Sequence, residues 1–247
     1  MKQKLMTVAS LAALAGSAMA ANIAGTGTGI IGYNSAIDST LGTSYIRSDQ
    51  PDGTTVRITD GVYGTNGSFG AVIDTWNAQQ TGTEFGYYGV TGITIPGGEQ
   101  VTNLTVSLLL AGDGGWFGPN VSGPGNFGNL AAGDLTVPTV QITSDGGTTW
   151  TSIGASSNDY LTQLTGAGVG GPGDPRYSTV SFDLDTPQVG IDGIRLIGSA
   201  GGGPAGADQQ GFVGVAEFEV NTGAIPEPSS LALLGLSLFG LTRRCRK

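Results

Sequence analysis

The sequence predicts an all-β fold, a sandwich or a barrel, carried by one domain over residues 21–223. Three observations lead to this prediction. Short runs of alternating apolar and polar residues recur along the chain, helical periodicity is nearly absent, and glycine-rich turns separate the runs. Glycine supplies 45 of the 247 residues, yet 38% of all residues are hydrophobic, which leaves enough apolar side chains for a core.

Seven runs are expected to form strands because they alternate in polarity or are rich in β-branched residues. In chain order they are residues 54–58, 101–110, 137–142, 150–153, 179–184, 191–197 and 212–220. In the last run, Ala216, Phe218 and Val220 are expected to share one face of the strand. Glu217 and Glu219 are expected on the opposite face.

The connections between these runs are rich in glycine. Asp145-Gly146-Gly147 predicts a hairpin turn. It lies within residues 143–150, which resemble the Asp-box of propeller glycosidases, with Thr143 where serine is usual. That box recurs in every propeller blade and occurs once here, so we expect an isolated hairpin with Trp150 packed beside its turn. Surface loops are expected at residues 112–133, 166–173 and 198–211.

Composition excludes several classes of site and partner. The chain has no histidine and one cysteine, Cys245, which excludes histidine-dependent triads, zinc sites built on histidine or on cysteine pairs, and an internal disulfide. A cation held by oxygen ligands, such as calcium, remains open. Away from the basic chain ends, four arginines stand against eighteen acidic residues, a net charge of −14. Such a body repels phosphate, so no nucleic-acid partner is expected.

The N-terminal segment, residues 1–20, has the organisation of a secretory signal peptide. Lys2 and Lys4 precede an apolar run, and Ala18-Met19-Ala20 forms the small-residue cleavage site. We expect signal peptidase to cleave after Ala20, so that the mature protein folds outside the cytoplasm.

The C-terminal segment, residues 224–247, has three parts. Pro226-Glu227-Pro228 precedes an apolar stretch at residues 229–241, and a basic tail follows. As a helix this stretch reaches about 20 Å, short of the roughly 30 Å hydrocarbon core of a bilayer. Physical reasoning alone therefore predicts a short hydrophobic helix that acts as a marginal anchor, with its basic tail in the cytoplasm.

The order of these three parts resembles the PEP-CTERM sorting signal of Gram-negative bacteria, a segment that is also labelled an ice-binding-protein C-terminal domain. The resemblance implies transient anchoring in the inner membrane through residues 229–241. It also implies processing near Pro226, Glu227 and Pro228 by an exosortase-type transpeptidase. The expected destination is the cell surface or the extracellular matrix, where such proteins accompany extracellular polysaccharide.

Two distant segments carry a second resemblance. Residues 58–65 hold an Asp-Gly turn at Asp60 with Thr65 five positions later, and residues 211–220 hold a strand that reads Glu-x-Glu-Val from Glu217. Together they resemble the discoidin-like jelly-roll domains, also called coagulation-factor type C or galactose-binding-like domains. This resemblance implies a discoidin-like β-sandwich for the whole body.

In that family such a loop and strand commonly share a structural calcium ion. The resemblance implies Asp60 and Glu217 as carboxylate ligands, Thr65 as a hydroxyl or carbonyl ligand, and Ala216 as a carbonyl ligand. Calcium takes about six to eight oxygen ligands, which a glycine-rich loop can supplement with its carbonyl groups. The alternative is an ordinary Asp-Gly turn beside a solvated acidic strand.

The usual ligand of that fold is carbohydrate. Trp116 and Phe117, with Phe127 behind them, are the candidates for a sugar platform, because aromatic rings stack on the apolar faces of sugars. The alternative is that Trp116 and Phe117 fold back as plugs beneath a long loop.

These observations favour an exported, non-catalytic surface or matrix protein that binds or organises extracellular polysaccharide. One alternative is a purely structural surface protein without specific sugar binding. Another is a glycosidase that uses paired carboxylates, such as Asp183 with Asp185 or Glu217 with Glu219. Ice binding ranks below these because no regular Thr-x-Thr ladder repeats along the body.

Overall fold

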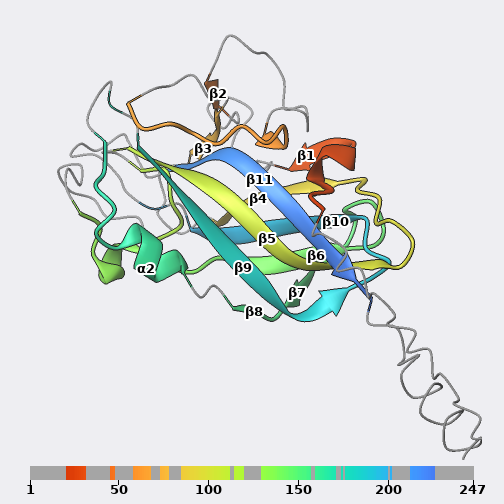
Figure 1. Ribbon diagram of the computed structural model, residues 1–247. Coiled ribbons are helices and arrows are strands. Elements are labelled where there is room, and N and C mark those ends of the chain that lie inside the picture. Colours follow the sequence, from red (N-terminus) through yellow and green to blue (C-terminus); the bar gives the residue numbers. More distant parts are fainter. Residues whose placement is uncertain are drawn as a thin grey trace, which may run out of the picture.

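The computed structural model describes residues 21–31, 45–47, 58–67, 73–77, 85–111, 114–119, 129–156, 159–170, 174, 176–199, 201 and 212–225. Its strands form two antiparallel sheets that face each other as the layers of a β-sandwich (Figure 1). The expected all-β, two-layer architecture is therefore confirmed, whereas the discoidin-like jelly roll stays a prediction. The signal segment at residues 1–20 and the segment at residues 226–247 lie outside the described residues.

The larger sheet has the strand order β2-β3-β11-β5-β9-β8. In that order its strands are β2 (Tyr45–Arg47), β3 (Ile73–Asn77), β11 (Phe212–Ala224), β5 (Glu99–Leu110), β9 (Arg176–Gln188) and β8 (Ala155–Ser156). The smaller sheet has the order β1-β4-β10-β6-β7. Its strands are β1 (Gly29–Ile31), β4 (Phe85–Thr91), β10 (Gly193–Ser199), β6 (Thr139–Thr143) and β7 (Thr151–Ile153). Short helical segments accompany them, namely η1 (Ala24–Thr26), η2 (Ala132–Asp134) and α2 (Tyr160–Leu164).

Most strands lie where the sequence predicts them. The six later runs are confirmed as β5, β6, β7, β9, β10 and β11, with small shifts at their ends. Of the first run, residues 54–58, only Ile58 is described. It belongs to no strand, so the prediction that the run extends to Ile58 is wrong. Five strands, β1, β2, β3, β4 and β8, lie outside the expected runs, and in β4 glycines interrupt the alternating pattern. One of them, Gly89, allows β10 to approach, since a Cβ atom there would overlap the carbonyl oxygen of Ile194.

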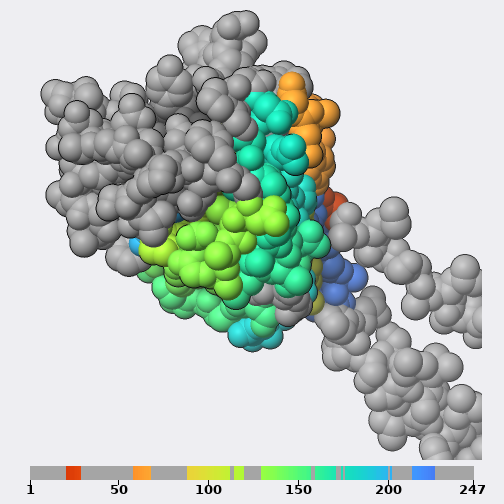
Figure 2. Space-filling model, turned by 90° about the vertical axis from the view of Figure 1, so that its left-hand side faces the viewer, coloured from red at the N-terminus to blue at the C-terminus, as the bar shows by residue number. Residues whose placement is uncertain are grey.

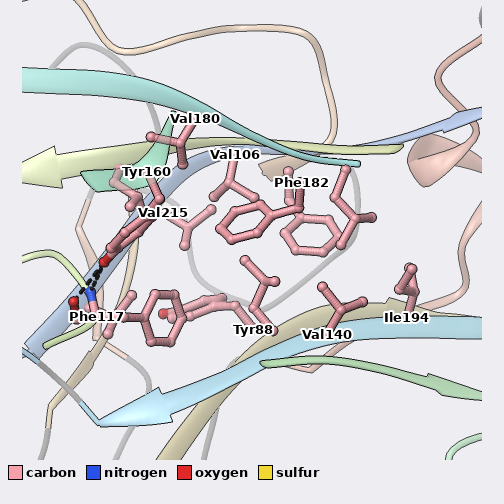
Figure 3. Close-up of a cluster of buried hydrophobic side chains, with 14 of the residues drawn as sticks. Tyr88, Val106, Phe117, Val140, Tyr160, Val180, Phe182, Ile194 and Val215 are labelled. Atoms are coloured by element: carbon pink, nitrogen blue, oxygen red, sulfur yellow. Dashed lines mark hydrogen bonds between the residues drawn. The ribbon is translucent and has the colours of Figure 1, made fainter. Parts of the chain in front are cut away.

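The hydrophobic core lies between the two sheets. Side chains from both layers meet there (Figure 3), Val106, Val180 and Phe182 from the larger sheet and Tyr88, Val140 and Ile194 from the smaller. Each of these is at most 1% exposed. Burial of a large apolar side chain contributes about 1.5–3 kcal/mol, so this interface is the main source of stability.

The glycine-rich stretch at residues 112–133 is not a plain surface loop, which corrects the prediction. Its residues 114–118 are buried, and their backbone is hydrogen-bonded to the end of β10 and to the start of β11. The Gly118 amide donates a hydrogen bond to the Ser199 carbonyl (3.0 Å), and the Gly214 amide donates one to the Gly115 carbonyl (3.1 Å). Backbone hydrogen bonds therefore order a stretch that the sequence pattern left without structure.

The first described residues lie against the last strand. The Ile23 amide donates to the Val220 carbonyl (2.8 Å), and the Thr222 amide donates to the Ala21 carbonyl (3.0 Å). The side chain of Asn22 also accepts a hydrogen bond from the Val220 amide (3.1 Å). Both ends of the described body therefore meet at β11, the blue strand of Figure 1.

Candidate functional site

One segment, residues 58–67, crosses the outer face of the larger sheet, and we call it the strap. Its Gly61 amide donates a hydrogen bond to Glu217 Oε2 of β11 (3.0 Å). At its other end, Asn66 Oδ1 accepts a hydrogen bond from the Tyr177 amide of β9 (2.9 Å). Figure 2 shows the strap in orange on the surface, beside teal residues near the start of β9. The strap therefore spans from β11 to β9, over β5, which lies between them.

The strap lies close to the sheet. A Cβ atom at Gly64 would overlap the ring of Tyr177, so glycine is what permits this approach. Ser107 and Leu109 of β5 alternate with residues of the core and so lie on the outer face, yet they are only 1% and 2% exposed. The outer face of the sheet is thus shielded from water where the strap crosses it.

A β-bulge on β11 determines what lies beneath the strap. The register between β11 and β5 shifts at Ala216, which becomes the extra residue of the bulge. Ala216 packs with Leu109 on the outer face, apart from the main core. The prediction that Ala216 shares a face with Phe218 and Val220 is therefore wrong, because strict alternation ends at the bulge.

Glu217 is a buried carboxyl group in acidic surroundings. Its side chain is 0% exposed, its Oε2 accepts the Gly61 hydrogen bond, and its Oε1 has no hydrogen-bond partner. Burial, helped by the charges of Asp60 and Glu219, raises the pKa of Glu217 to about 8. An ionised carboxylate in such a place requires a compensating positive charge, because water cannot solvate it.

The second carboxyl group of this strand, Glu219, has a donor from the strap. The Tyr63 side chain hydrogen-bonds to it, and burial together with this bond raises the pKa of the Tyr63 phenol well above its usual value. Glu219 is also half-buried rather than fully buried. The two neighbouring carboxyl groups therefore differ, since Glu217 keeps one oxygen that no group of the protein pairs.

The structure brings the two predicted calcium-binding segments together. Asp60 lies close enough for its charge to raise the pKa of Glu217. Its own side chain is exposed, and its Oδ1 accepts a hydrogen bond from the Val62 amide (2.9 Å). Thr65 is exposed as well, and Ala216 is buried in the bulge. Within the part of the chain that the structure describes, no three acidic or cysteine side chains gather as metal ligands, so a cation here would also need hydroxyl and carbonyl oxygens.

The aromatic residues expected as a sugar platform lie in the interior. Trp116 and Phe117 are both 0% exposed. The indole Nε1 of Trp116 donates a hydrogen bond to the Asp134 carbonyl (2.9 Å), and Phe117 lies between the layers (Figure 3). These two rings fill the core, as in the plug alternative, and present no face to a ligand. Phe127 lies outside the described residues.

An aromatic side chain does reach the outer face of the smaller sheet. The expected hairpin forms between β6 and β7, and Trp150 Nε1 donates to the Gly147 carbonyl (3.0 Å), which packs the ring beside the turn. Arg195 of β10 lies over that ring, with Cζ 4.1 Å from the ring centroid, and its Nε donates to Gln141 Oε1 of β6 (2.8 Å). Neither Trp150 nor Arg195 is fully buried.

The C-terminal segment indicates where in the cell the protein is delivered. Residues 224–247 match the PEP-CTERM protein-sorting motif. This is the range expected from the sequence. The PEP-CTERM motif implies that the protein is exported, processed by an exosortase-type enzyme and sorted to the cell surface. No curated protein matches the chain. Among the described residues no helix has the length and apolar character needed to cross a membrane, and the PEP-CTERM apolar stretch at residues 229–241 lies outside them.

Sequence reasoning did not single out two residues of this site, Ser107 and Tyr63. Ser107 interrupts an otherwise apolar run, residues 106–110, on a strand that is buried on both faces, and this interruption is the signal that could have found it. Nothing in the sequence around Tyr63 indicates its contact with Glu219, because that contact depends on the path of the strap across the sheet.

Proposed function

We propose that this chain is an exported, non-catalytic surface protein whose discoidin-like β-sandwich is stabilised by calcium and binds or organises extracellular polysaccharide. The PEP-CTERM match supports export. The unpaired Oε1 of the buried Glu217 is the observation that carries the calcium part. On this proposal the protein passes through the inner membrane of a Gram-negative bacterium. It reaches the cell surface or the extracellular matrix after processing near Pro226, Glu227 and Pro228.

The residues present fit a calcium ion. An ionised carboxyl group that is buried away from water is destabilising unless a cation compensates its charge. Glu217 is buried and its Oε1 is unpaired, so on ionisation it would be such a group, and Asp60 adds a second negative charge nearby. Thr65, through its hydroxyl or carbonyl, and the Ala216 carbonyl are the further proposed ligands, because calcium prefers oxygen.

A bound calcium ion would supply the positive charge that fastens the strap to the sheet. Gly61 and Glu217 are 156 positions apart, so a calcium ion that links the strap to β11 would close a long loop, whose ordering is entropically costly. Secreted domains often use disulfides for this purpose, but this body has no cysteine. The body is rich in acidic residues, so a cation held by oxygen ligands is a cross-link that the composition of the body allows.

Chelation tests the calcium part. EDTA is expected to lower the melting temperature of the full chain, and Asp60→Ala or Glu217→Gln is expected to abolish that response. Glu219→Gln is the matched control and should keep the response, because Tyr63 already pairs that carboxyl group. A melting temperature that does not change with EDTA would refute the calcium site.

The stack of Arg195 on Trp150 supports the polysaccharide part. The indole ring holds the Arg195 guanidinium group at the surface, and a guanidinium group donates hydrogen bonds to hydroxyl and carboxylate oxygens. The stack lies on the outer face of the smaller sheet, whereas the strap lies on the outer face of the larger sheet. The proposed sugar surface and the proposed calcium site are therefore separate and can be tested independently.

A pull-down with the producer's own exopolysaccharide tests this part. Arg195→Ala is expected to reduce the bound fraction. Arg176→Ala is the matched control, because that arginine is exposed on the larger sheet and paired with Asp174 (3.8 Å). Absence of binding by the wild-type chain at millimolar polysaccharide would favour the purely structural alternative.

A zymogram tests the non-catalytic part, and we expect no hydrolysis of polysaccharide. Hydrolysis that is lost in Asp183→Asn or Glu217→Gln would instead favour the glycosidase alternative.

A further inference from the structure

Ser107 of β5 lies directly opposite Glu217 of β11. The two residues are register partners in the ladder between these strands, and both side chains lie on the outer face of the sheet, beneath the strap. They are 1% and 0% exposed. Directly opposed residues of antiparallel strands have Cβ atoms about 4.5–5.5 Å apart, so one small bound species can reach both side chains.

Each of these side chains keeps an unpaired oxygen. Neither Ser107 Oγ nor Glu217 Oε1 has a hydrogen-bond partner. An unpaired polar group in the interior costs about 1–3 kcal/mol, so two at facing positions call for a common explanation. A single bound species that contacts both oxygens provides one.

The unpaired state is specific to this position. Thr105, the previous outward residue on β5, donates a hydrogen bond to Asn103 Oδ1 (3.1 Å) and accepts one from Asn221 Nδ2 (3.2 Å). The Thr105 hydroxyl, two residues away on the same face of β5, therefore has protein partners on both sides. Only opposite Glu217 does the described outer face of β5 hold a buried hydroxyl without one.

We propose that Ser107 Oγ is a further oxygen ligand of the calcium ion at Glu217. The inference rests on the calcium part of the proposed function. A hydroxyl group is a hard, neutral oxygen donor, which suits calcium and adds no negative charge beside three acidic side chains. With Ser107 the ion contacts β5, β11 and the strap together, so calcium holds the strap to the middle of the larger sheet.

Calcium titration of the chelator-treated full chain tests this inference, with calorimetry as the measurement. Ser107→Ala is expected to raise the dissociation constant at least tenfold. Ser181→Ala, the same change on the same face of neighbouring β9, is the matched control and is expected to bind as the wild type does. Unchanged affinity in Ser107→Ala, with binding still lost in Glu217→Gln, would overturn the role of Ser107 and leave the calcium site in place. Absence of binding by the wild-type chain would overturn both.

Stability without calcium gives a second readout that does not depend on affinity. In EDTA, Ser107→Ala is expected to melt at or above the wild-type temperature, because it removes an unpaired buried hydroxyl. In excess calcium it is expected to melt below the wild type. An equal loss of stability in both conditions would assign the hydroxyl to a hydrogen bond with the Glu217 carboxyl group and overturn the proposal.

A second pair of variants keeps the test valid if alanine does not fold at this position. Ser107→Thr and Ser107→Val have the same shape and differ in one hydroxyl group. The threonine variant is expected to keep the rise in melting temperature on calcium addition, and the valine variant is expected to lose it. Equal responses from the two variants would overturn the inference.

Discussion

The hydroxyl group of Tyr160 holds both polar backbone groups of Phe117. It accepts a hydrogen bond from the Phe117 amide (2.8 Å) and donates one to the Phe117 carbonyl (2.6 Å). One side chain of the short helix α2 therefore completes the hydrogen bonding of a buried residue 43 positions away (Figure 3). Burial raises the pKa of Tyr160 far above its ordinary value, so the hydroxyl stays protonated and can donate.

Tyr160→Phe is expected to destabilise the fold by about 1–3 kcal/mol, because it leaves the buried Phe117 amide without an acceptor. The Phe117 carbonyl would keep its hydrogen bond from the Thr136 amide (3.1 Å), so one group and not two becomes unpaired. Urea unfolding measures the change. A variant as stable as the wild type would show that another acceptor replaces the hydroxyl.

Gly64→Ala is expected to displace the strap, because the new methyl group would overlap the Tyr177 ring. Forcing a methyl group into a packed contact costs about 1–3 kcal/mol, and the response of the melting temperature to calcium should weaken with it. Gly97→Ala is the matched control, since no heavy atom lies within 4 Å of the added group. Thermal melts of both variants with calcium and with EDTA check this, and equal behaviour would contradict it.

The metal-free protein is expected to lose stability as the pH rises from about 5 to about 8. The folded-state pKa of Glu217 is raised to about 8 from an ordinary value near 4.5, so the folded state binds more protons than the unfolded state between these values. Its contribution is complete below the unfolded pKa and disappears as the pH passes the folded pKa, with a slope of up to about 1.4 kcal/mol per pH unit.

Melting temperatures in EDTA across this pH range measure the effect. Glu217→Gln should remove the Glu217 part of the slope, because glutamine does not titrate, whereas Glu219→Gln should keep it. A wild-type melting temperature that is flat from pH 5 to pH 8 in EDTA would contradict the raised pKa of Glu217.

Asp145→Asn is expected to weaken the hairpin between β6 and β7 at neutral pH. Hydrogen bonds from Thr149 and Thr143 lower the pKa of Asp145 to about 2. Because the folded pKa is depressed, the stabilisation is complete above the ordinary pKa near 3.8 and is lost as the pH falls through about 2. The stability difference between the two proteins should therefore be largest above pH 4 and shrink toward pH 2, as acid unfolding can measure. A difference that does not depend on pH would contradict it.

The sequence was sufficient for features that depend on local pattern. Alternation and glycine-rich turns located six strands, Asp145-Gly146-Gly147 located the hairpin, and the C-terminal motif was found at its matched range. Such features can be read because neighbours in the sequence cause them. The encounter of Asp60 with Glu217 was expected from a family resemblance, since no local pattern links segments that far apart.

What the sequence did not reveal depends on the third dimension. The bulge at Ala216 reverses the face on which that residue lies, and alternation cannot indicate where a ladder gains a residue. Trp116 and Phe117 lie among glycines, which is typical of a loop, yet burial of their rings between the sheets outweighs that local preference. Ser107 is a candidate ligand only because β11 places Glu217 opposite it and the strap covers it, and neither contact is visible in the sequence.

Strand β11 leads directly into the sorting segment and pairs with β3 along its first residues and with β5 along most of its length. A pull on the C-terminus, such as the translocation machinery or a surface tether would exert, therefore runs along the strand and loads these ladders in shear. Hydrogen bonds in shear share the force among them, whereas an edge strand peeled from its end breaks them one at a time. Because β11 lies between β3 and β5 in the larger sheet, tension applied at the C-terminus acts first on a strand that two neighbours hold.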